Sequence, residues 1–379
     1  MNESHESSQK LNGVGIISFT GPGAGEIVLS NLIDVLQALS HEIHVFSISH
    51  ERFFFKDDQG LHIHNLEYKP GSNILSRIVK NIFLQLRISY QLARMARKID
   101  LCIFFMAGYG LVLPMIAVRA CRKKVILALT GSQVDDAKAR NDPLWRELKF
   151  LVETGYSLSD RIIIYSENVA KELNLKKYRN KISIAHEHFL DFDKFQIQKP
   201  LSERDNVIGY IGRLSEEKGT LNLMEAISQV AEKRDEVAFL IGGDGQLRPQ
   251  VEEYATKLNN KVKFVGWIAH DELPEYLNKL KLLVLPSYTE GLPNIMLEAM
   301  ACGTPVLATP VGAIPDVIKD GETGFIMENN SPECIAEDIV RALDYPTQEQ
   351  ITRNARTLVE KEFTYQAAVA GYRRILNLE

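Results

Sequence analysis

Short apolar runs alternate with longer helical patterns along the first half of the chain. The runs are continuous rather than alternating with polar residues, which is typical of strands of a parallel sheet covered on both faces by helices. The predicted strands of this half are residues 14–19, 42–49, 100–105, 124–130, 161–167 and 181–186. The predicted helices between them are residues 27–39, 74–98, 111–122 and 143–158. The pattern predicts an α/β, Rossmann-like fold.

The same pattern starts again after a polar stretch at 191–205 that we interpret as a linker. The predicted strands of this second half are 206–212, 237–245, 261–267, 282–287, 305–310 and 324–327, with a helix at 220–233. A chain of 379 residues is long enough for two domains of ordinary size. We therefore expect two doubly wound domains facing across a cleft, with ligands bound outside the carboxyl ends of the strands.

Composition places the protein among globular chains with an ample core, since 45% of its residues are hydrophobic and 25% are charged. Residues 1–200 carry 26 basic and 21 acidic side chains, whereas the rest carry 18 and 28, which makes the first half positive and the second negative. The four cysteines form no C-x-x-C pair, no secretory signal is evident, and no apolar run approaches the ~20 residues of a membrane span. We expect a cytoplasmic protein with reduced cysteines.

A cationic turn follows the first strand of the second half. In YIGRLSEEKG (210–219), Arg213 and Lys218 stand where a strand passes into a helix, and Gly219 precedes that helix. Two cations beside the free N–H groups of a helix start form an anion site, although the loop is not a Walker sequence. An ordinary solvated turn with Lys218 paired to Glu216 or Glu217 explains the same residues.

Two carboxylates bracket an apolar corner in EGLPNIMLE (290–298). Glu290 lies in the loop after the predicted strand 282–287, and Pro293 suits the first turn of a helix that is apolar nearly all round. Glu298 in a buried helix is costly without a partner, which is either a core cation or a pair of ligand hydroxyl groups. Gly291 allows a ligand to approach the backbone closely.

The segments GRLSEEKG, GGDG, PSYTEGLPNIMLEAMACGTPVLATPVGAIPDVI and DGETGF, in this order, resemble retaining glycosyltransferases of family 4, the glycosyl transferases group 1 with the GT-B fold. The similarity is strong only from about 206 to 330. It implies an N-terminal acceptor domain at 1–193, a C-terminal donor domain at 194–360, and a helix at 361–379 that crosses back to the first domain. It also implies closure of the domains over the donor, which excludes water.

The resemblance implies a role for each motif. Arg213 and Lys218 neutralise the donor diphosphate and stabilise the leaving group, with Glu290 as the third catalytic residue, so that no metal and no cofactor is required. Glu298 accepts hydrogen bonds from the ribose hydroxyl groups. The remaining donor contacts are Gly243 and Asp244 near the nucleotide, Trp267 and Ile268 near the base, and Gly291, Leu292, Pro293 and Asn294 at the sugar.

In the first domain the resemblance is weaker. GPGAGE (21–26) supplies Gly23 and Ala24, or Gly23 and Gly25, where the family has two glycines near the donor phosphate. A dinucleotide fingerprint would need glycine where Glu26 stands. Thr130 occupies the position of a histidine that many members carry. A threonine can bond a sugar hydroxyl but cannot act as a general base near neutral pH.

One segment of the sequence gives information on the kind of acceptor. Residues 69–98 carry seven basic and no acidic side chains, and the apolar residues fall at helical spacing. A basic amphipathic helix at the inner face of a membrane and a core helix with a solvated basic face both fit this pattern. The aromatic stretch SHERFFF (49–55) and the positive first half favour the membrane, and hence a lipid-linked or glycan acceptor, whereas no nucleic-acid motif is present.

Histidines occur in two further places. His186 and His188 flank Glu187. They either approach the cleft or have a structural place, at the surface or in packing between the domains, and the structural interpretation is favoured. His62 and His64 share one strand face, but no third ligand is apparent, so they are interpreted as structural.

The resemblance implies a retaining, metal-independent hexosyltransferase that uses a UDP- or GDP-linked sugar. The main alternative, raised by Thr130, is a non-catalytic subunit or sensor that binds nucleotide sugars. A phosphorylase or sugar-nucleotide epimerase is disfavoured by the Glu290–Glu298 corner, and a phosphorylase also by the absence of a pyridoxal-lysine motif.

Overall fold

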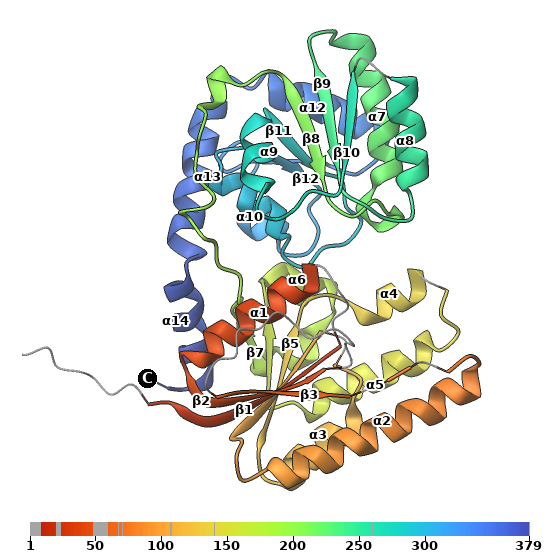
Figure 1. The fold of residues 1–379 in the computed structure, drawn as a ribbon, viewed down its shortest axis with the longest axis vertical. Coiled ribbons are helices and arrows are strands. Elements are labelled where there is room, and N and C mark those ends of the chain that lie inside the picture. The colour runs from red at the N-terminus through yellow and green to blue at the C-terminus, as the bar shows by residue number, and fades with distance from the viewer. Residues whose placement is uncertain are drawn as a thin grey trace, which may run out of the picture. The chain divides into compact units, whose positions relative to one another are not determined.

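The computed structural model describes residues 9–19, 24–47, 60–66, 68–69, 71–106, 108–139, 141–258 and 261–378. The chain forms two compact units, one comprising residues 1–188 and 365–379 and the other residues 189–364 (Figure 1).

The first unit is a seven-stranded, wholly parallel sheet in the order β3-β2-β1-β4-β5-β6-β7. Its strands are β1 (Leu11–Ser18), β2 (Ser40–Ser47), β3 (Leu61–Asn65), β4 (Leu101–Phe105), β5 (Lys124–Leu129), β6 (Arg161–Ile164) and β7 (Ile182–Ile184). Its helices are α1 (Ala24–Gln37), α2 (Ile74–Met95), α3 (Val112–Ala120), α4 (Gln133–Ala139), α5 (Trp145–Leu158), α6 (Glu167–Glu172), the 3₁₀ helix η1 (Leu175–Lys181) and α14 (Tyr365–Leu376).

Helices cover both faces of this sheet. The helices α2, α3 and α5 pack side by side on one face, and α1 lies on the other, where α14 packs against it (Figure 1). This division follows from right-handed crossovers, because the strand order reverses between β1 and β4. Strand β4, in the middle of the sheet, is apolar and buried at all five residues.

The second unit is a six-stranded parallel sheet in the order β10-β9-β8-β11-β12-β13. Its strands are β8 (Val207–Ile211), β9 (Ala238–Gly242), β10 (Val262–Gly266), β11 (Leu282–Leu285), β12 (Val306–Ala308) and β13 (Phe325–Ile326). Its helices are α7 (Thr220–Lys233), α8 (Arg248–Lys257), α9 (Leu273–Lys279), α10 (Asn294–Ala301), α11 (Ile314–Val317), α12 (Pro332–Leu343), α13 (Gln348–Glu362), and the 3₁₀ helices η2 (Leu201–Glu203) and η3 (Glu216–Lys218).

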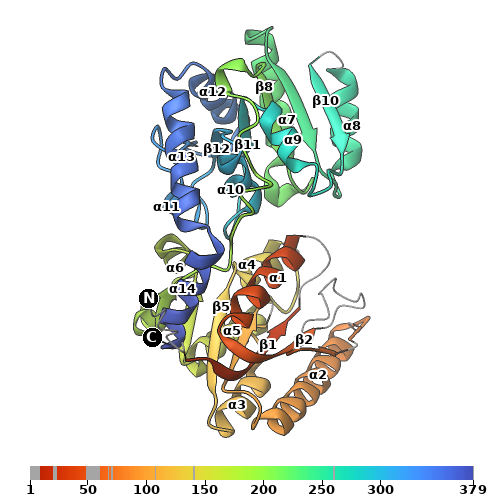
Figure 2. The same cartoon turned by 60° about the vertical axis from the view of Figure 1, so that its left-hand side comes forward.

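The helices of this unit also pack in two groups, and they are labelled in the second view (Figure 2). Helix α7 packs against α8 and α12, whereas α10 packs against α9 and α13. The strand order reverses between β8 and β11, so the loops after these two strands meet at the carboxyl edge of the sheet.

The α/β class and the two parallel-sheet domains predicted from the sequence are confirmed. The predicted helix 220–233 coincides with α7, and the buried helix after Pro293 is α10, whose last six residues are buried. Strand β3 is missing from the predicted set. It pairs with β2 at the edge of the first sheet, and most of its residues are exposed, so it lacks the apolar run by which the other strands were recognised. Within the described part of the chain, no helix is long and apolar enough to cross a membrane.

Candidate active site

The predicted cationic turn lies against the end of a neighbouring strand. Gly219 has a φ of 68°, and a Cβ at this position would lie 2.1 Å from the carbonyl oxygen of Pro286. A residue with a side chain would therefore clash at position 219, and glycine allows the turn after β8 to approach the loop after β11. The backbone N–H of Tyr288 donates to the carbonyl of Glu217 at 2.9 Å, which holds the two loops together.

Lys218 and Glu290 meet at this junction. The Nζ of Lys218 donates to Oε1 of Glu290 at 2.7 Å, and the hydroxyl of Ser287 donates to the same oxygen at 2.7 Å. The Glu290 side chain is 10% exposed and that of Lys218 26%. The ammonium group has three donors, of which Glu290 takes one, so a phosphate oxygen can accept another. The alternative pairing of Lys218 with Glu216 or Glu217 is not observed.

Arg213 projects further into solvent. Its side chain is 62% exposed, and its guanidinium lies 3.5 Å from a carboxylate oxygen of Glu217. Such an exposed pair contributes little to stability. The guanidinium can therefore exchange Glu217 for the oxygens of an anion at small cost.

Glu298 has a partner that was not predicted from the sequence. The carboxylate is almost wholly buried in α10, and His270 Nε2 lies 2.9 Å from its Oε1. The Nζ of Lys194 lies 2.9 Å from the other ring nitrogen of His270. A lysine ammonium can only donate, so Nδ1 of His270 accepts and Nε2 carries the proton that it donates to Glu298. Glu298 is thus held by a histidine rather than by the core Arg or Lys of the structural alternative.

The loop after β9 passes close to the loop after β8. Gly243 has a φ of 133°, and a Cβ there would lie 1.8 Å from the carbonyl oxygen of Gly212. Asp244 accepts a hydrogen bond from the N–H of Gly245 at 2.8 Å, and Arg248 lies 3.6 Å from its other oxygen. This glycine-rich turn leaves backbone groups near the carboxyl edge of the sheet.

The two residues predicted to lie near the nucleotide base differ in their exposure to solvent. The Trp267 side chain is largely exposed, whereas Ile268 is buried. The Cδ1 atom of Ile268 lies so close to Gly242 that a Cβ on this glycine would be 2.5 Å away. Trp267 can therefore offer a ring face to a ligand, and Ile268 packs inside the unit.

The loop that precedes α10 is fixed by the loop after β12. The N–H of Ala313 donates to the carbonyl of Gly291 at 2.8 Å, and Gly312, with a φ of 60°, packs on the carbonyl of Glu290. Leu292 and Pro293 are buried, and Asn294 is the first residue of α10. The four residues predicted at the sugar therefore form one continuous, tightly held segment.

Thr130 belongs to the first unit and follows β5. The hydroxyl of Tyr109 lies 3.2 Å from Thr130 Oγ1 and accepts the N–H of Thr130 at 2.8 Å. Burial raises the pKa of Tyr109 to about 12, so this phenol stays protonated. Gly23 lies outside the described residues, as does the aromatic stretch 49–55, and Ala24 and Gly25 begin α1.

Known proteins match the part of the chain that contains the corner of Lys218, Glu290 and Glu298. Residues 191–358 match the model of the family glycosyl transferases group 1. The match covers most of the second unit. The predicted recognition is thereby confirmed, and the match includes Lys194 and His270 together with every predicted donor residue from Arg213 to Glu298.

Individual relatives match in part. The alpha-D-kanosaminyltransferase of Streptomyces kanamyceticus is 30% identical over 52% of this chain and 53% of its own length. The capsular polysaccharide biosynthesis glycosyltransferase CapM of Staphylococcus aureus is 31% identical over 57% of this chain and 58% of its own length. The alignments thus span little more than half of these curated relatives.

The fold is that of a known structure over nearly the whole chain. The Anabaena protein HepE, solved in complex with UDP, superposes with a TM-score of 0.73 over 96% of this chain and 99% of its own, at 16% identity. The predicted GT-B fold of two Rossmann-like domains is confirmed by this likeness.

Proposed function

We propose that the protein is a retaining, metal-independent hexosyltransferase that moves a sugar from a UDP- or GDP-linked donor to a hydroxyl group of a lipid-linked or glycan acceptor. The second unit binds the donor, and the first unit binds the acceptor in the cytoplasm, at the inner face of the membrane. The proposal rests on the corner of Lys218, Glu290 and Ser287, inside the region that matches the group 1 family.

The chemistry follows from the charges at this corner. Lys218 and Arg213 donate to the diphosphate and stabilise the negative charge that grows on the leaving phosphate, which replaces the usual divalent ion. Glu290, oriented by Ser287, holds the sugar beside the same lysine. Glu298 uses an oxygen to accept hydrogen bonds from the ribose hydroxyl groups, while His270 holds the carboxylate in place.

Donor binding is tested by thermal shift with UDP, GDP, ADP and their common sugar conjugates. We expect one nucleotide series to stabilise the wild-type protein and Lys218→Ala to lose this stabilisation. Loss of a charge-assisted hydrogen bond costs about 1.5–3 kcal/mol, which corresponds to roughly 10- to 150-fold weaker binding. Lys257→Ala is the matched control, because Lys257 is an exposed lysine of the same unit paired only along α8.

Two results would contradict the donor site. One is an absence of stabilisation by every nucleotide, and the other is equal stabilisation of the wild type and Lys218→Ala. Binding without transfer to any acceptor, and without slow hydrolysis of the donor, would instead support the non-catalytic sensor suggested by Thr130.

The membrane contact is proposed from the faces of α2. Leu84, Gln85, Ile88 and Leu92 are buried against the unit. The exposed apolar side chains of the helix are Ile74, Leu75, Ile78, Val79, Ile82, Phe83, Leu86 and Tyr90. At ~100° per residue these eight fall within one arc of about 180°, and the exposed Lys80, Arg87 and Arg94 follow on the next arc.

This arrangement favours an anionic lipid surface. A core helix with a solvated basic face accounts for the four buried residues but leaves the exposed apolar arc unexplained. Leu75 is 72% exposed and Phe83 68%. An apolar arc flanked by basic residues is what an interfacial helix presents to anionic lipid.

Vesicle co-sedimentation tests this contact. We expect binding to vesicles enriched in an anionic phospholipid and not to neutral phosphatidylcholine. Replacing Lys80, Arg87 and Arg94 by Gln removes ~1 kcal/mol each, or roughly 100-fold in affinity altogether. Leu75→Ser with Phe83→Ser should also abolish binding, whereas Ile184→Ser, at an exposed apolar site on β7, should not. Equal binding by all variants would refute the role of α2.

A further inference from the structure

Two neighbouring strands of the first sheet bring histidines and a carboxylate together. In the parallel register of β2 and β3, His44 lies opposite His62 and Phe46 opposite His64. Opposed residues of paired strands point to the same face of a sheet, and Glu42 shares this face because it precedes His44 by two residues. From the sequence alone, His62 and His64 of β3 are interpreted as structural. Their further partners come from β2, and only the register reveals them.

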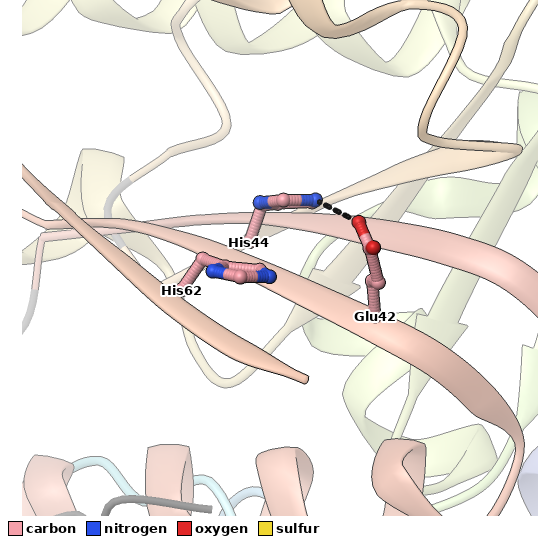
Figure 3. Close-up of side chains that lie close together, drawn as sticks. All are labelled: Glu42, His44 and His62. Carbon is pink, nitrogen blue, oxygen red and sulfur yellow. Dashed lines mark hydrogen bonds and ion pairs between the residues drawn. The ribbon is translucent and has the colours of Figure 1, made fainter. Parts of the chain in front are cut away.

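The side chains converge on one small volume (Figure 3). The rings of His44 and His62 are stacked, with centroids 4.7 Å apart and planes 15° apart. Nε2 of His44 lies 3.2 Å from Oε2 of Glu42. One potential ligand atom from each of Glu42, His44 and His62 lies within 4.8 Å of the other two.

We propose that Glu42, His44 and His62 bind a first-row divalent metal ion of the zinc class. Nitrogen and carboxylate ligands at about 2.0–2.1 Å in a tetrahedral site are separated from each other by about 3.3 Å. The His44–Glu42 separation already has this size. One potential ligand atom of His62 lies within 4.8 Å of those of Glu42 and His44, and this exposed ring turns out of its stack with His44 to coordinate the same ion.

His64 has the position of a residue that orients a metal ligand. Its Nε2 lies 3.3 Å from Nδ1 of His44. When His44 ligates through Nε2, its proton resides on Nδ1 and is donated to His64. Without metal the protons sit the other way round, with His44 Nε2–H donating to Glu42 and His64 Nε2–H donating to His44. Metal binding therefore requires a tautomer change in His44 and His64 together with the movement of His62.

Packing alone accounts for the stacked rings, and a hydrogen bond to Glu42 accounts for the buried ring of His44. The proposal therefore rests on the convergence of three potential ligands from two neighbouring strands on one face of the sheet.

Metal binding is measured on the full chain after chelator treatment and dialysis. We expect one equivalent of Zn²⁺ by calorimetry, a tetrahedral visible spectrum with Co²⁺, and a higher melting temperature with Zn²⁺. His62→Ala should weaken binding by about tenfold or more, since loss of even an outer partner commonly costs 10- to 100-fold. Because His62 is exposed, this variant should fold normally.

His41→Ala is the matched control. His41 is an exposed histidine of β2 whose side chain points to the opposite face of the sheet, so its loss should leave binding unchanged. Failure of the wild type to bind one equivalent would overturn the proposal, as would equal affinity in the wild type and His62→Ala. Nucleotide-dependent stabilisation is measured in the same samples, so this result stands apart from the outcome at the donor site.

Discussion

Glu187 is a fully buried carboxyl group in the segment that follows β7. The hydroxyl of Tyr165 donates to one of its oxygens at 2.6 Å, and that of Tyr372 to the other at 3.0 Å. Burial outweighs these hydrogen bonds and raises the pKa of Glu187 to about 7. Burial also keeps the pKa of both tyrosines well above the usual value, so the phenols remain donors. The histidines on either side do not lie free at a surface. His188 is buried, and Nδ1 of His186 lies 3.1 Å from the carbonyl oxygen of His188.

This shift predicts a pH-dependent stability. Between about pH 4.5 and 7 the unfolded chain has lost the proton of Glu187 while the folded chain retains it. The free energy of unfolding therefore falls as the pH rises through this window, by about 3 kcal/mol at most. Glu187→Gln mimics the protonated form and should flatten this slope.

Chemical denaturation at a series of pH values measures the effect. The difference between the wild type and Glu187→Gln isolates this one group from the other titrating residues. Glu153→Gln, at an exposed site on α5, should follow the wild type. If the wild type and Glu187→Gln show the same slope between pH 4.5 and 7, Glu187 is ionised in the folded protein throughout.

The charged residues of the candidate site could be predicted from the sequence, but the partner of each could not. The spacing of GRLSEEKG and EGLPNIMLE singled out Lys218, Glu290 and Glu298 as ligand-binding residues. Their partners depend on which loops meet at the edge of the sheet. The contact of Lys218 with Glu290 spans 72 residues, and that of His270 with Glu298 spans 28. Nothing local in the sequence marks such a contact.

At the scale of helices and strands, the buried strands were predicted from the sequence and an exposed one was not. Strands inside the sheets, such as β4 and β11, are apolar at every position, and the sequence predicted them. Strand β3 was not predicted, because it is an edge strand in which polar residues are exposed. Helix α2 was predicted over 74–98 and is observed at Ile74–Met95. Its apolar spacing was visible in the sequence, but which apolar residues stay exposed depends on how α3 packs against it.

At the scale of the whole molecule, the chain builds two separate cores, and its last helix belongs to the first. Helix α14 packs on α1, and the hydroxyl of Tyr365 donates to the carbonyl of Asp34. Tyr372 is fully buried in the same unit, and its hydroxyl donates to Glu187, which lies 185 residues earlier in the chain. Ile351 of α13, only 21 residues earlier, is buried instead in the core of the second unit.

Scanning calorimetry should therefore show two transitions, of which donor nucleotide raises only the one that belongs to the second unit. Tyr372→Ala removes a buried aromatic side chain and should destabilise the first unit by about 3–5 kcal/mol. Ile351→Ala should destabilise the second unit by about 2–5 kcal/mol and lower the nucleotide-sensitive transition. Each variant serves as the control for the other, since each should leave one transition in place. If both variants lower the same transition, the two cores unfold as one cooperative unit, and the separation of the chain into two independently stable domains is wrong.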